Sequence, residues 1–424
     1  MTNPANNSAF TVGNTIRSTA FVFLLVLLLM VATSQVTQAQ TFTVLHTFTG
    51  MNDGLAPIGG VSIDMSGNLY GSATFGGDYA PACAPTGCGI VFKLTHSGGG
   101  WILNPLYSFH GGTDGAYPET SLVRSEDGSF YSTSSGGGQF GYGTVFRLQP
   151  PPSGCKTALC PWTKTQLYAF TNDGLGNAPI GALLISSGDI YGVSLGGMVY
   201  ELTPDGGGWT ESTLYSSLDS PEGGVVFDRS GNLYGTCATA GENGHGFVYQ
   251  LAPSGSGWTL NTLVFFDGSN GSRPWGGLVM DASGNLFGTT SMDGPNDGGT
   301  VFELTPQNGS WSFATIYAFS AQEGQPLGTL TIDVQGNLYG TTNAGFGTVF
   351  ELARGVDGWT YSVLHSFTGG MDGANPSNAG VTLDSNGNIY GTASGGGSSN
   401  CIDGCGVVFE ISPLAATLAA DNWR

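Results

Sequence analysis

The amino-acid sequence predicts an all-β protein whose strands form seven four-stranded blades arranged in a ring. A ten-residue pattern of the type DASGNLFGTT, found at Asp281–Thr290, recurs along the chain. Repeats of roughly 50 residues with no sustained helical period indicate a β-propeller. The central aromatic residue of the pattern falls at seven positions: Tyr70, Tyr131, Tyr191, Tyr234, Phe287, Tyr339 and Tyr390.

The fifth copy illustrates the four strands that we expect in each blade. A short apolar run, GGLVMD, precedes the turn ASGN and a second strand, LFGTT. TVFELTP and WSFATIYAF supply the third and fourth strands. Segments rich in Val, Phe, Tyr and Thr and bounded by Gly, Asn, Asp and Pro are typical of strands. The unalternating apolar run Leu278–Met280 predicts an innermost strand that is covered on both faces.

The repeated D-x-x-G-N motif is typical of a hairpin turn between the first and second strands. An Asp side chain accepts hydrogen bonds from backbone amides two residues on, and Gly and Asn tolerate the left-handed conformation of tight turns. Calcium binding at these Asp residues is the alternative. One carboxylate per turn is too few ligands for Ca²⁺, so we expect no cofactor.

The two ends of the repeat region predict how the ring closes. The region begins with a fourth-strand segment, Thr41–Phe48, and ends with a third-strand segment, Gly406–Pro413. The last blade therefore lacks its own outer strand, and we expect the N-terminal strand to pair there. A single domain then covers residues 40–413, followed by a short tail at 414–424.

The first 39 residues have the features of a signal peptide. Arg17 is the only basic residue among them, Ala20–Ala32 is an apolar run too short to span a bilayer comfortably, and Thr37–Ala39 is a candidate cleavage site. An uncleaved membrane anchor is the alternative. We expect the membrane to be involved only through this segment.

Composition limits the classes of partner. Charged residues make up only 9% of the chain, and the formal net charge is −20. An acidic chain does not bind nucleic acid or an anionic membrane by charge. The sparsely charged surface is typical of an extracellular protein, and we expect a monomer.

The seven cysteines form three close pairs and one single residue. The pairs are Cys83 with Cys88, Cys155 with Cys160, and Cys401 with Cys405. Zinc is the alternative, but these spacings lack the partners of a zinc site, and an export signal favours three local disulfides. Cys237 is expected to be a buried free thiol.

The repeated elements GNLYGTT and GGTVFEL, followed by a Trp, resemble the GloVer tandem repeat of secreted bacterial proteins that carry varied C-terminal anchors. The resemblance covers Thr41 to about Pro413. It implies a secreted or cell-surface protein and implies no particular chemistry. No sorting signal is visible after Pro413, which favours release or a periplasmic location over anchoring.

The blade-to-blade loops contain the residues that we predict to bind a ligand. Variable loops on a rigid scaffold are where function usually resides. Five Asp-Gly pairs are expected to surround one mouth of the ring, as an acidic rim for a cation or for sugar hydroxyls, with turn formation as the alternative. Tyr117 and Trp275, in the same loops, are candidate stacking platforms for sugars, with loop packing as the alternative. The five acids are Asp53, Asp114, Asp173, Asp267 and Asp372.

No catalytic motif is present, since the chain contains no G-x-S-x-G, H-E-x-x-H or P-loop. His46 and His365 occupy a position that is Tyr in other copies, which indicates strand residues. We therefore expect a recognition module for carbohydrate or for an envelope protein. The alternatives are a structural or adhesive envelope protein, and a carbohydrate-active hydrolase or lyase using rim carboxylates such as Asp114 and Asp372.

Overall fold

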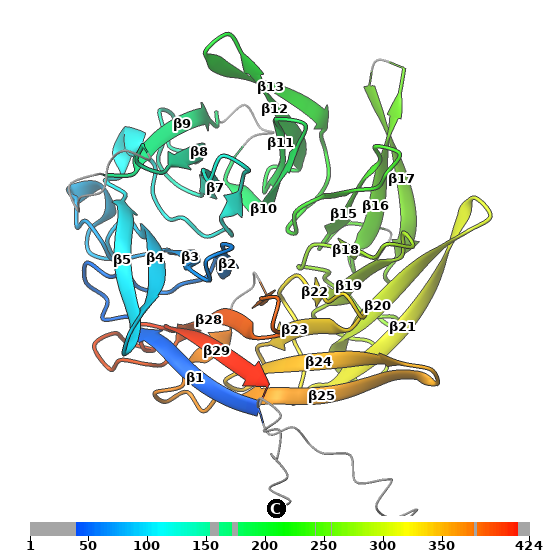
Figure 1. The fold of residues 1–424 in the computed structure, drawn as a ribbon. Helices are drawn as coiled ribbons and strands as arrows, with labels where there is room; N and C mark the ends of the chain where they lie inside the picture. The colour runs from blue at the N-terminus through cyan, green and yellow to red at the C-terminus, as the bar shows by residue number, and fades with distance from the viewer. Residues whose placement is uncertain are drawn as a thin grey trace, which may run out of the picture. The chain divides into compact units, whose positions relative to one another are not determined.

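The computed structural model describes residues 40–152, 161–171, 177–241, 243–255, 257–376 and 380–413. The chain divides into two compact units, Thr41–Ser412 and the end segments Met1–Gln40 with Pro413–Arg424. The larger unit is a ring of seven antiparallel sheets (Figure 1), which confirms the predicted seven-bladed β-propeller. The predicted signal peptide and tail lie outside the described residues. No helix in the described ranges is long and apolar enough to cross a membrane.

In six blades the four strands follow one another along the chain, and each hydrogen bonds to the next. The first strands are β2 (Val61–Ile63), β6 (Val123–Arg124), β10 (Pro179–Ser186), β14 (Val226–Phe227), β18 (Val279–Met280), β22 (Thr331–Ile332) and β27 (Thr382–Leu383). The second strands, which contain the repeated aromatic residue, are β3 (Leu69–Ala73), β7 (Phe130–Ser134), β11 (Asp189–Ser194), β15 (Leu233–Cys237), β19 (Leu286–Thr290), β23 (Leu338–Thr342) and β28 (Ile389–Gly395).

The outer half of each blade is an antiparallel pair formed by its third and fourth strands at the rim of the ring (Figure 1). The third strands are β4 (Ile90–Ser97), β8 (Thr144–Gln149), β12 (Met198–Asp205), β16 (Phe247–Ser254), β20 (Asp297–Gln307), β24 (Thr348–Gly355) and β29 (Val407–Pro413). The fourth strands are β5 (Gly100–Ser108), β9 (Thr163–Ala169), β13 (Gly208–Tyr215), β17 (Gly257–Phe265), β21 (Ser310–Ser320), β25 (Gly358–Ser366) and, in the last blade, β1 (Gln40–Thr47).

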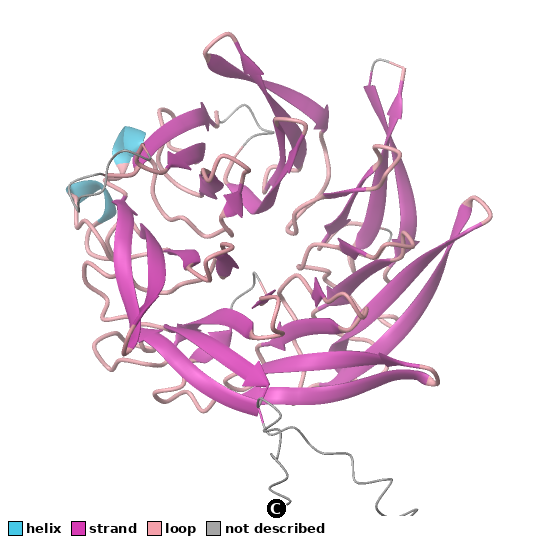
Figure 2. Cartoon of the chain, viewed as in Figure 1, coloured by secondary structure: helices cyan, strands magenta, loops and turns pink. Residues whose placement is uncertain are grey.

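The last blade is completed by the start of the chain, as predicted. β1 pairs with β29 in a sheet of order β1-β29-β28-β26. This sheet has one strand more than expected, because β26 (Ala374–Pro376) pairs with the far end of β28 while β27 pairs with its near end. Two 3-10 turns, η1 (Pro81–Cys83) and η2 (Gly112–Asp114), are the only helical segments in the described residues (Figure 2).

A glycine follows the repeated aromatic residue in the second strand and leaves room for an aromatic side chain of the third strand of the same blade. Gly288 pairs with Phe302, and a Cβ at Gly288 would lie 2.5 Å from Cζ of that ring. The same pairing joins a glycine to a Phe or Tyr in six blades, and Ser132 replaces the glycine opposite Phe146 in the second blade. A ring that covers a strand glycine compensates for the missing side chain.

The hydrophobic core lies between blades rather than within one. Each of seven buried clusters combines residues from two neighbouring blades. In one, Tyr234 and Val248 of the fourth blade pack with Leu278 and Phe302 of the fifth. A blade therefore buries its two faces only when both neighbouring blades are present, so the stability of each blade depends on its neighbours.

The innermost strand of the fifth blade contacts a neighbouring blade on each face, as predicted, but two of its side chains are not fully buried. Leu278 is buried, but Val279 and Met280 of β18 are only half-buried. Residues at the start of the first strands line a cavity near the centre of the ring. Val279 packs against the cluster shared with the sixth blade and Met280 against the cluster shared with the fourth, so both faces of β18 contact a neighbouring blade.

Candidate functional site

The repeated Asp forms the turn that the sequence predicts. Oδ1 of Asp281 accepts the backbone N–H groups of Ser283 at 2.8 Å and Asn285 at 2.9 Å, and Gly284 has a φ of 87°. The amide of Asn285 donates to Oδ2 at 2.8 Å. The same bonds recur at Asp64, Asp228, Asp333 and Asp384. The repeated acids are thus occupied within their own hairpins.

A second repeated feature is the backbone conformation at the start of each blade. A non-glycine residue in the left-handed conformation precedes a proline, and the first strand follows. The positions and φ angles are Ala56 (54°), Tyr117 (62°), Ala178 (45°), Ser220 (49°), Arg273 (54°), Gln325 (64°) and Asn375 (52°). This conformation is costly for a side-chain-bearing residue, by about 1–3 kcal/mol, and such residues cluster at functional sites.

Backbone hydrogen bonds hold these residues in place. The N–H of Tyr117 donates to the carbonyl of Cys88 in the preceding blade at 2.9 Å, and the carbonyl of Tyr117 accepts from Ser135 of its own blade at 3.0 Å. Equivalent pairs of bonds hold Ala56, Ala178, Arg273 and Gln325. In these five blades the backbone before the proline is therefore held mainly by main-chain hydrogen bonds, and the hydroxyls of Ser135 and Ser291 also donate to the carbonyls of Tyr117 and Arg273.

The residues after the prolines gather around a central cavity of about 350 Å³, here called the axial cavity. All seven blades contribute to its lining; the last does so through Val381 and Thr382. Six post-proline residues line it: Ile58, Glu119, Ile180, Glu222, Trp275 and Leu327. The seventh, Ser377, lies outside the described residues.

Two carboxylates dominate the chemistry of the axial cavity. Glu222 is only 9% exposed, no described residue forms a hydrogen bond or ion pair with its carboxylate, and burial raises its pKa to about 7. Burial also raises the pKa of Glu119, although a hydrogen bond from Ser135 opposes this. Neither acid has a basic partner, because the described lining residues include no Lys, Arg or His.

The hydroxyl groups of the lining hold neighbouring blades together. Ser121 donates to the carbonyl of Gly59 at 2.8 Å, Thr329 accepts the N–H of Gly277 at 2.9 Å, and Thr382 donates to the carbonyl of Val61 at 2.5 Å. These bonds join consecutive blades, including the last to the first. The carboxylate of Glu222 forms no such bond with the described residues, and the half-buried indole of Trp275 belongs to the same lining.

The unpaired acid has a consequence for stability. Because Glu222 binds its proton more tightly in the folded state than its ordinary pKa of 4.5 would allow, folding is weakened as the pH rises from 4.5 through 7. The full difference corresponds to roughly 3 kcal/mol, and we expect solvent screening at a group that lines a cavity to reduce it to about 1–2 kcal/mol. We expect Glu222→Gln to raise the free energy of unfolding by that amount at pH 8 and hardly at all at pH 4.

Urea unfolding of the wild-type protein and the variant at both pH values measures this effect. Glu126→Gln, at an exposed position, is the control and is expected to unfold like the wild type at both. An equal effect of Glu222→Gln at pH 4 and pH 8 would show that the carboxyl has an ordinary pKa.

The four described acids of the rim predicted from the sequence lie in separate blade-to-blade loops, and none of the four is among the lining residues of the axial cavity. Asp53 accepts hydrogen bonds from the Thr49 N–H at 2.9 Å and the Thr49 hydroxyl at 2.6 Å, and it lies 3.3 Å from His46. Asp372 makes the same contacts with Thr368 and, at 3.2 Å, His365. Both acids fasten a loop to its preceding fourth strand.

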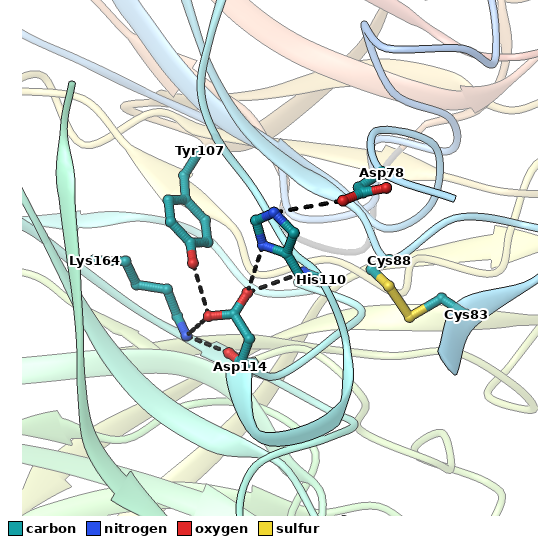
Figure 3. A network of polar contacts seen from close by, with 7 residues as sticks. All are labelled: Asp78, Cys83, Cys88, Tyr107, His110, Asp114 and Lys164. Atoms are coloured by element: carbon teal, nitrogen blue, oxygen red, sulfur yellow. Dashed lines mark hydrogen bonds and ion pairs between the residues drawn. A yellow bond between two sulfur atoms is a disulfide. The ribbon is translucent and has the colours of Figure 1, made fainter. Parts of the chain in front are cut away.

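Asp114 belongs to the densest polar network of the rim (Figure 3). Its Oδ1 accepts from the Tyr107 hydroxyl at 2.7 Å and from Lys164 Nζ at 2.9 Å, and its Oδ2 accepts from the His110 N–H at 2.9 Å. His110 also lies 3.4 Å from Asp78, beside the Cys83–Cys88 disulfide. Burial raises the pKa of Asp114, but these hydrogen bonds outweigh it and leave the pKa lowered.

The position of Lys164 indicates that this network stabilises the fold. Its side chain is 4% exposed and its Nζ lies between 5.2 and 5.8 Å from the ring centres of Tyr107, Phe109 and Phe146. Burial lowers the pKa of the lysine, and Asp114 opposes this. An acid and a base paired in this way stabilise the contact between the first two blades and leave little free charge for a ligand.

The remaining predicted site residues differ in position. Asp267 is exposed and accepts the N–H and hydroxyl of Ser269 at 2.9 and 2.7 Å. Tyr117 packs against Phe75, with ring centres 5.6 Å apart, and does not line the axial cavity. Trp275 does line it, and Asp173 lies outside the described residues. Ligand binding at all of these positions stays a prediction.

Two of the predicted disulfides are present, Cys83–Cys88 and Cys401–Cys405. Cys155 and Cys160 lie outside the described residues. Cys237 is a buried free thiol, as predicted, and burial raises its pKa. No group of three or more His, Cys, Asp and Glu side chains within the described ranges is arranged to hold a metal ion.

Sequence reasoning did not find Glu119 and Glu222. The signal was present, because a proline precedes each first strand and the residue after it can be aligned in seven copies. Those residues differ from copy to copy, so they do not look like a motif. Only closure of the ring brings Glu119, Glu222 and Trp275, from three different blades, to one cavity.

Solved structures with some similarity to this chain belong to proteins of several descriptions. A protein assigned as a 6-phosphogluconolactonase from Bacteroides uniformis has 15% identity and a TM-score of 0.48, covering 75% of this chain and 84% of its own. A Dyadobacter fermentans protein of unknown function has 12% identity and a TM-score of 0.45, covering 87% and 96%. A protein assigned as a glucose dehydrogenase from Thermus thermophilus has 14% identity and a TM-score of 0.38, covering 88% and 99%. At these scores no functional statement follows.

No curated protein matches the sequence. The family model for the Gloeobacter/Verrucomicrobia repeat matches twice, over residues 32–198 and 193–401. The two matches together span nearly all of the propeller and confirm the repeat type predicted from GNLYGTT and GGTVFEL. This chain belongs to the Gloeobacter/Verrucomicrobia repeat family.

Proposed function

We propose that this protein is a carbohydrate-binding module that holds one sugar unit in the axial cavity. The observation that carries the proposal is that one cavity of about 350 Å³ combines a tryptophan with two carboxylates that have no basic partner. An indole face suits the apolar face of a sugar ring, and carboxylates accept hydrogen bonds from hydroxyl groups. The volume is near the lower end for small-molecule sites, which suits a single unit.

An exported location is part of this proposal. The repeat family and the two disulfides are compatible with an extracellular protein. A site that recognises sugars would meet its ligand in the envelope or outside the cell. A purely adhesive or structural role would leave the buried, unpaired Glu222 without a purpose.

A glycan and polysaccharide array followed by titration calorimetry tests the proposal. We expect Trp275→Ala to lower the affinity for the best glycan at least tenfold without a large change in melting temperature, because an anchoring aromatic residue is a binding hot spot. EDTA should leave binding unchanged, because two carboxylates are too few to make a Ca²⁺ site.

The matched control is Phe140→Ala, which removes a 49% exposed aromatic side chain from the loop between β7 and β8, away from the axial cavity. Its affinity is expected to equal that of the wild type. Full affinity in Trp275→Ala, or an array on which no glycan binds, would contradict the proposal.

A further inference from the structure

We infer that the sugar bound in the axial cavity carries a free ammonium group, so that the ligand class is amino sugars rather than neutral or acidic ones. This inference rests on the proposed function and adds the charge of the ligand to it. It depends on three features of the cavity: the charge of its lining, the state of its polar groups and the position of its aromatic residue.

The lining has negative charge and nothing to balance it. Glu119 and Glu222 both line the cavity, and no Lys, Arg or His is present among the described lining residues. Burial of an ionised carboxylate without a counterion destabilises the protein. A cationic ligand that pairs with the carboxylate relieves this unfavourable free energy, and the relief contributes to the free energy of binding. The wider protein offers no compensation, because its formal net charge is −20. A cation is the ligand group that fits these carboxylates.

Some polar side chains of the cavity form hydrogen bonds within the protein, and others form none with the described residues. The hydroxyls of Ser121, Thr329 and Thr382 form hydrogen bonds between blades. Glu222, nine-tenths buried, receives no hydrogen bond from the described residues. Burial is the one cause of its raised pKa, as we expect for an acid that has no charged or hydrogen-bonding partner. A ligand donor therefore has to satisfy this carboxylate, and an ammonium group supplies three N–H donors.

The aromatic residue also favours a cation. Trp275 is the only aromatic residue among the described lining residues. Of the aromatic side chains, tryptophan attracts cations most strongly through its ring face. Uronic acids and phosphorylated sugars would be repelled by the two acids, and an N-acetyl group would replace the ammonium with a neutral amide. The cavity should therefore distinguish a free amine from its acetylated form.

The experiment compares probes that differ in one group. Methyl glucosaminide and methyl galactosaminide are titrated at pH 6.5 beside their N-acetyl forms and the parent methyl glycosides. Choline and its neutral isostere 3,3-dimethylbutan-1-ol add a charge that does not titrate. We expect each cationic probe to bind at least tenfold more tightly than its neutral match, and Glu222→Gln to remove that advantage while it changes the affinity of neutral probes less than twofold.

Proton release is a second readout that packing alone would not produce. A cation bound beside a carboxyl group that is partly protonated at pH 6.5 lowers its pKa and expels the proton. Calorimetry of choline in two buffers of different ionisation enthalpy is expected to show release of a fraction of a proton per choline, and none in Glu222→Gln. Glu126→Gln is the control and should behave as the wild type.

The outcomes separate the two proposals. Neutral sugars that bind in a Trp275-dependent manner, with no preference for the amine, would overturn this inference and leave the carbohydrate-binding function in place. Choline binding that depends on Glu222, with no sugar bound, would overturn the carbohydrate function and retain the preference for a cation. An amine preference that survives the Glu119→Gln, Glu222→Gln double variant would overturn the assignment to this cavity.

Discussion

Deletion of the N-terminal strand, Thr41–Phe48, is expected to prevent the chain from forming a stable ring. β1 is the only fourth strand of the last blade, and Phe48 also packs into the first blade, with its ring 5.4 Å from that of Phe92. Leu45 and Phe48 are 8% and 0% exposed. With half-buried Phe42 and Val44, these side chains contribute roughly 4–8 kcal/mol. That is a large share of the 5–15 kcal/mol typical of a whole domain.

Circular dichroism melting and gel filtration of the truncated protein measure this effect, and we expect loss of the cooperative transition together with aggregation. The control moves the same eight residues to follow Pro413 through a short Gly-rich turn, which gives the last blade the connectivity of the other six. That variant should regain a cooperative transition. A truncated protein that melts like the full chain would show that β1 does not close the ring.

Replacement of Phe302 by alanine is the second change with a large expected effect. The ring of Phe302 is fully buried between the fourth and fifth blades and covers Gly288. A Phe→Ala change in a packed core costs about 3–5 kcal/mol, since it removes apolar contacts and leaves a cavity. The opposite change, Gly288→Val, should be similarly harmful, because its Cβ would meet the Phe302 ring and, at 2.9 Å, Leu278.

Urea unfolding midpoints measure both changes. Ile102→Ala, at a 52% exposed position on β5, is the control, and we expect it to change the free energy of unfolding by less than about 1 kcal/mol. A Phe302→Ala variant as stable as this control would show that the aromatic rings over the glycines contribute little to the packing of the blades.

Local chemistry made most of the fold predictable. Asp281, Gly284 and Asn285 specify a tight turn through their own side chains and backbone preferences, so their recurrence revealed the hairpins. The placement of Thr41–Phe48 as a fourth strand followed from the order of elements. The half-burial of Val279 and Met280 did not, because apolar character alone does not reveal how completely neighbouring blades cover a strand of two residues.

The site was predictable only in part. Trp275 stood out as a large aromatic residue in a loop, and it does line the axial cavity. The Asp-Gly pairs stood out more, yet Asp53, Asp114 and Asp372 make their hydrogen bonds within the loops and to adjoining strands. Glu119 and Glu222 are 103 residues apart in the sequence, and their chemistry arises from burial in a shared space, which no local pattern records.

The left-handed residues before the prolines bear on how relatives of this protein could diverge. Five post-proline residues follow a left-handed residue whose N–H and carbonyl both form backbone hydrogen bonds, which the post-proline side chains do not supply. A point mutation at Ile58, Glu119 or Leu327 therefore alters what the cavity attracts and leaves the blade packing intact. Lineages that share this backbone can exchange ligands one blade at a time, and an exchange that alters the charge of the cavity also alters how stability depends on pH.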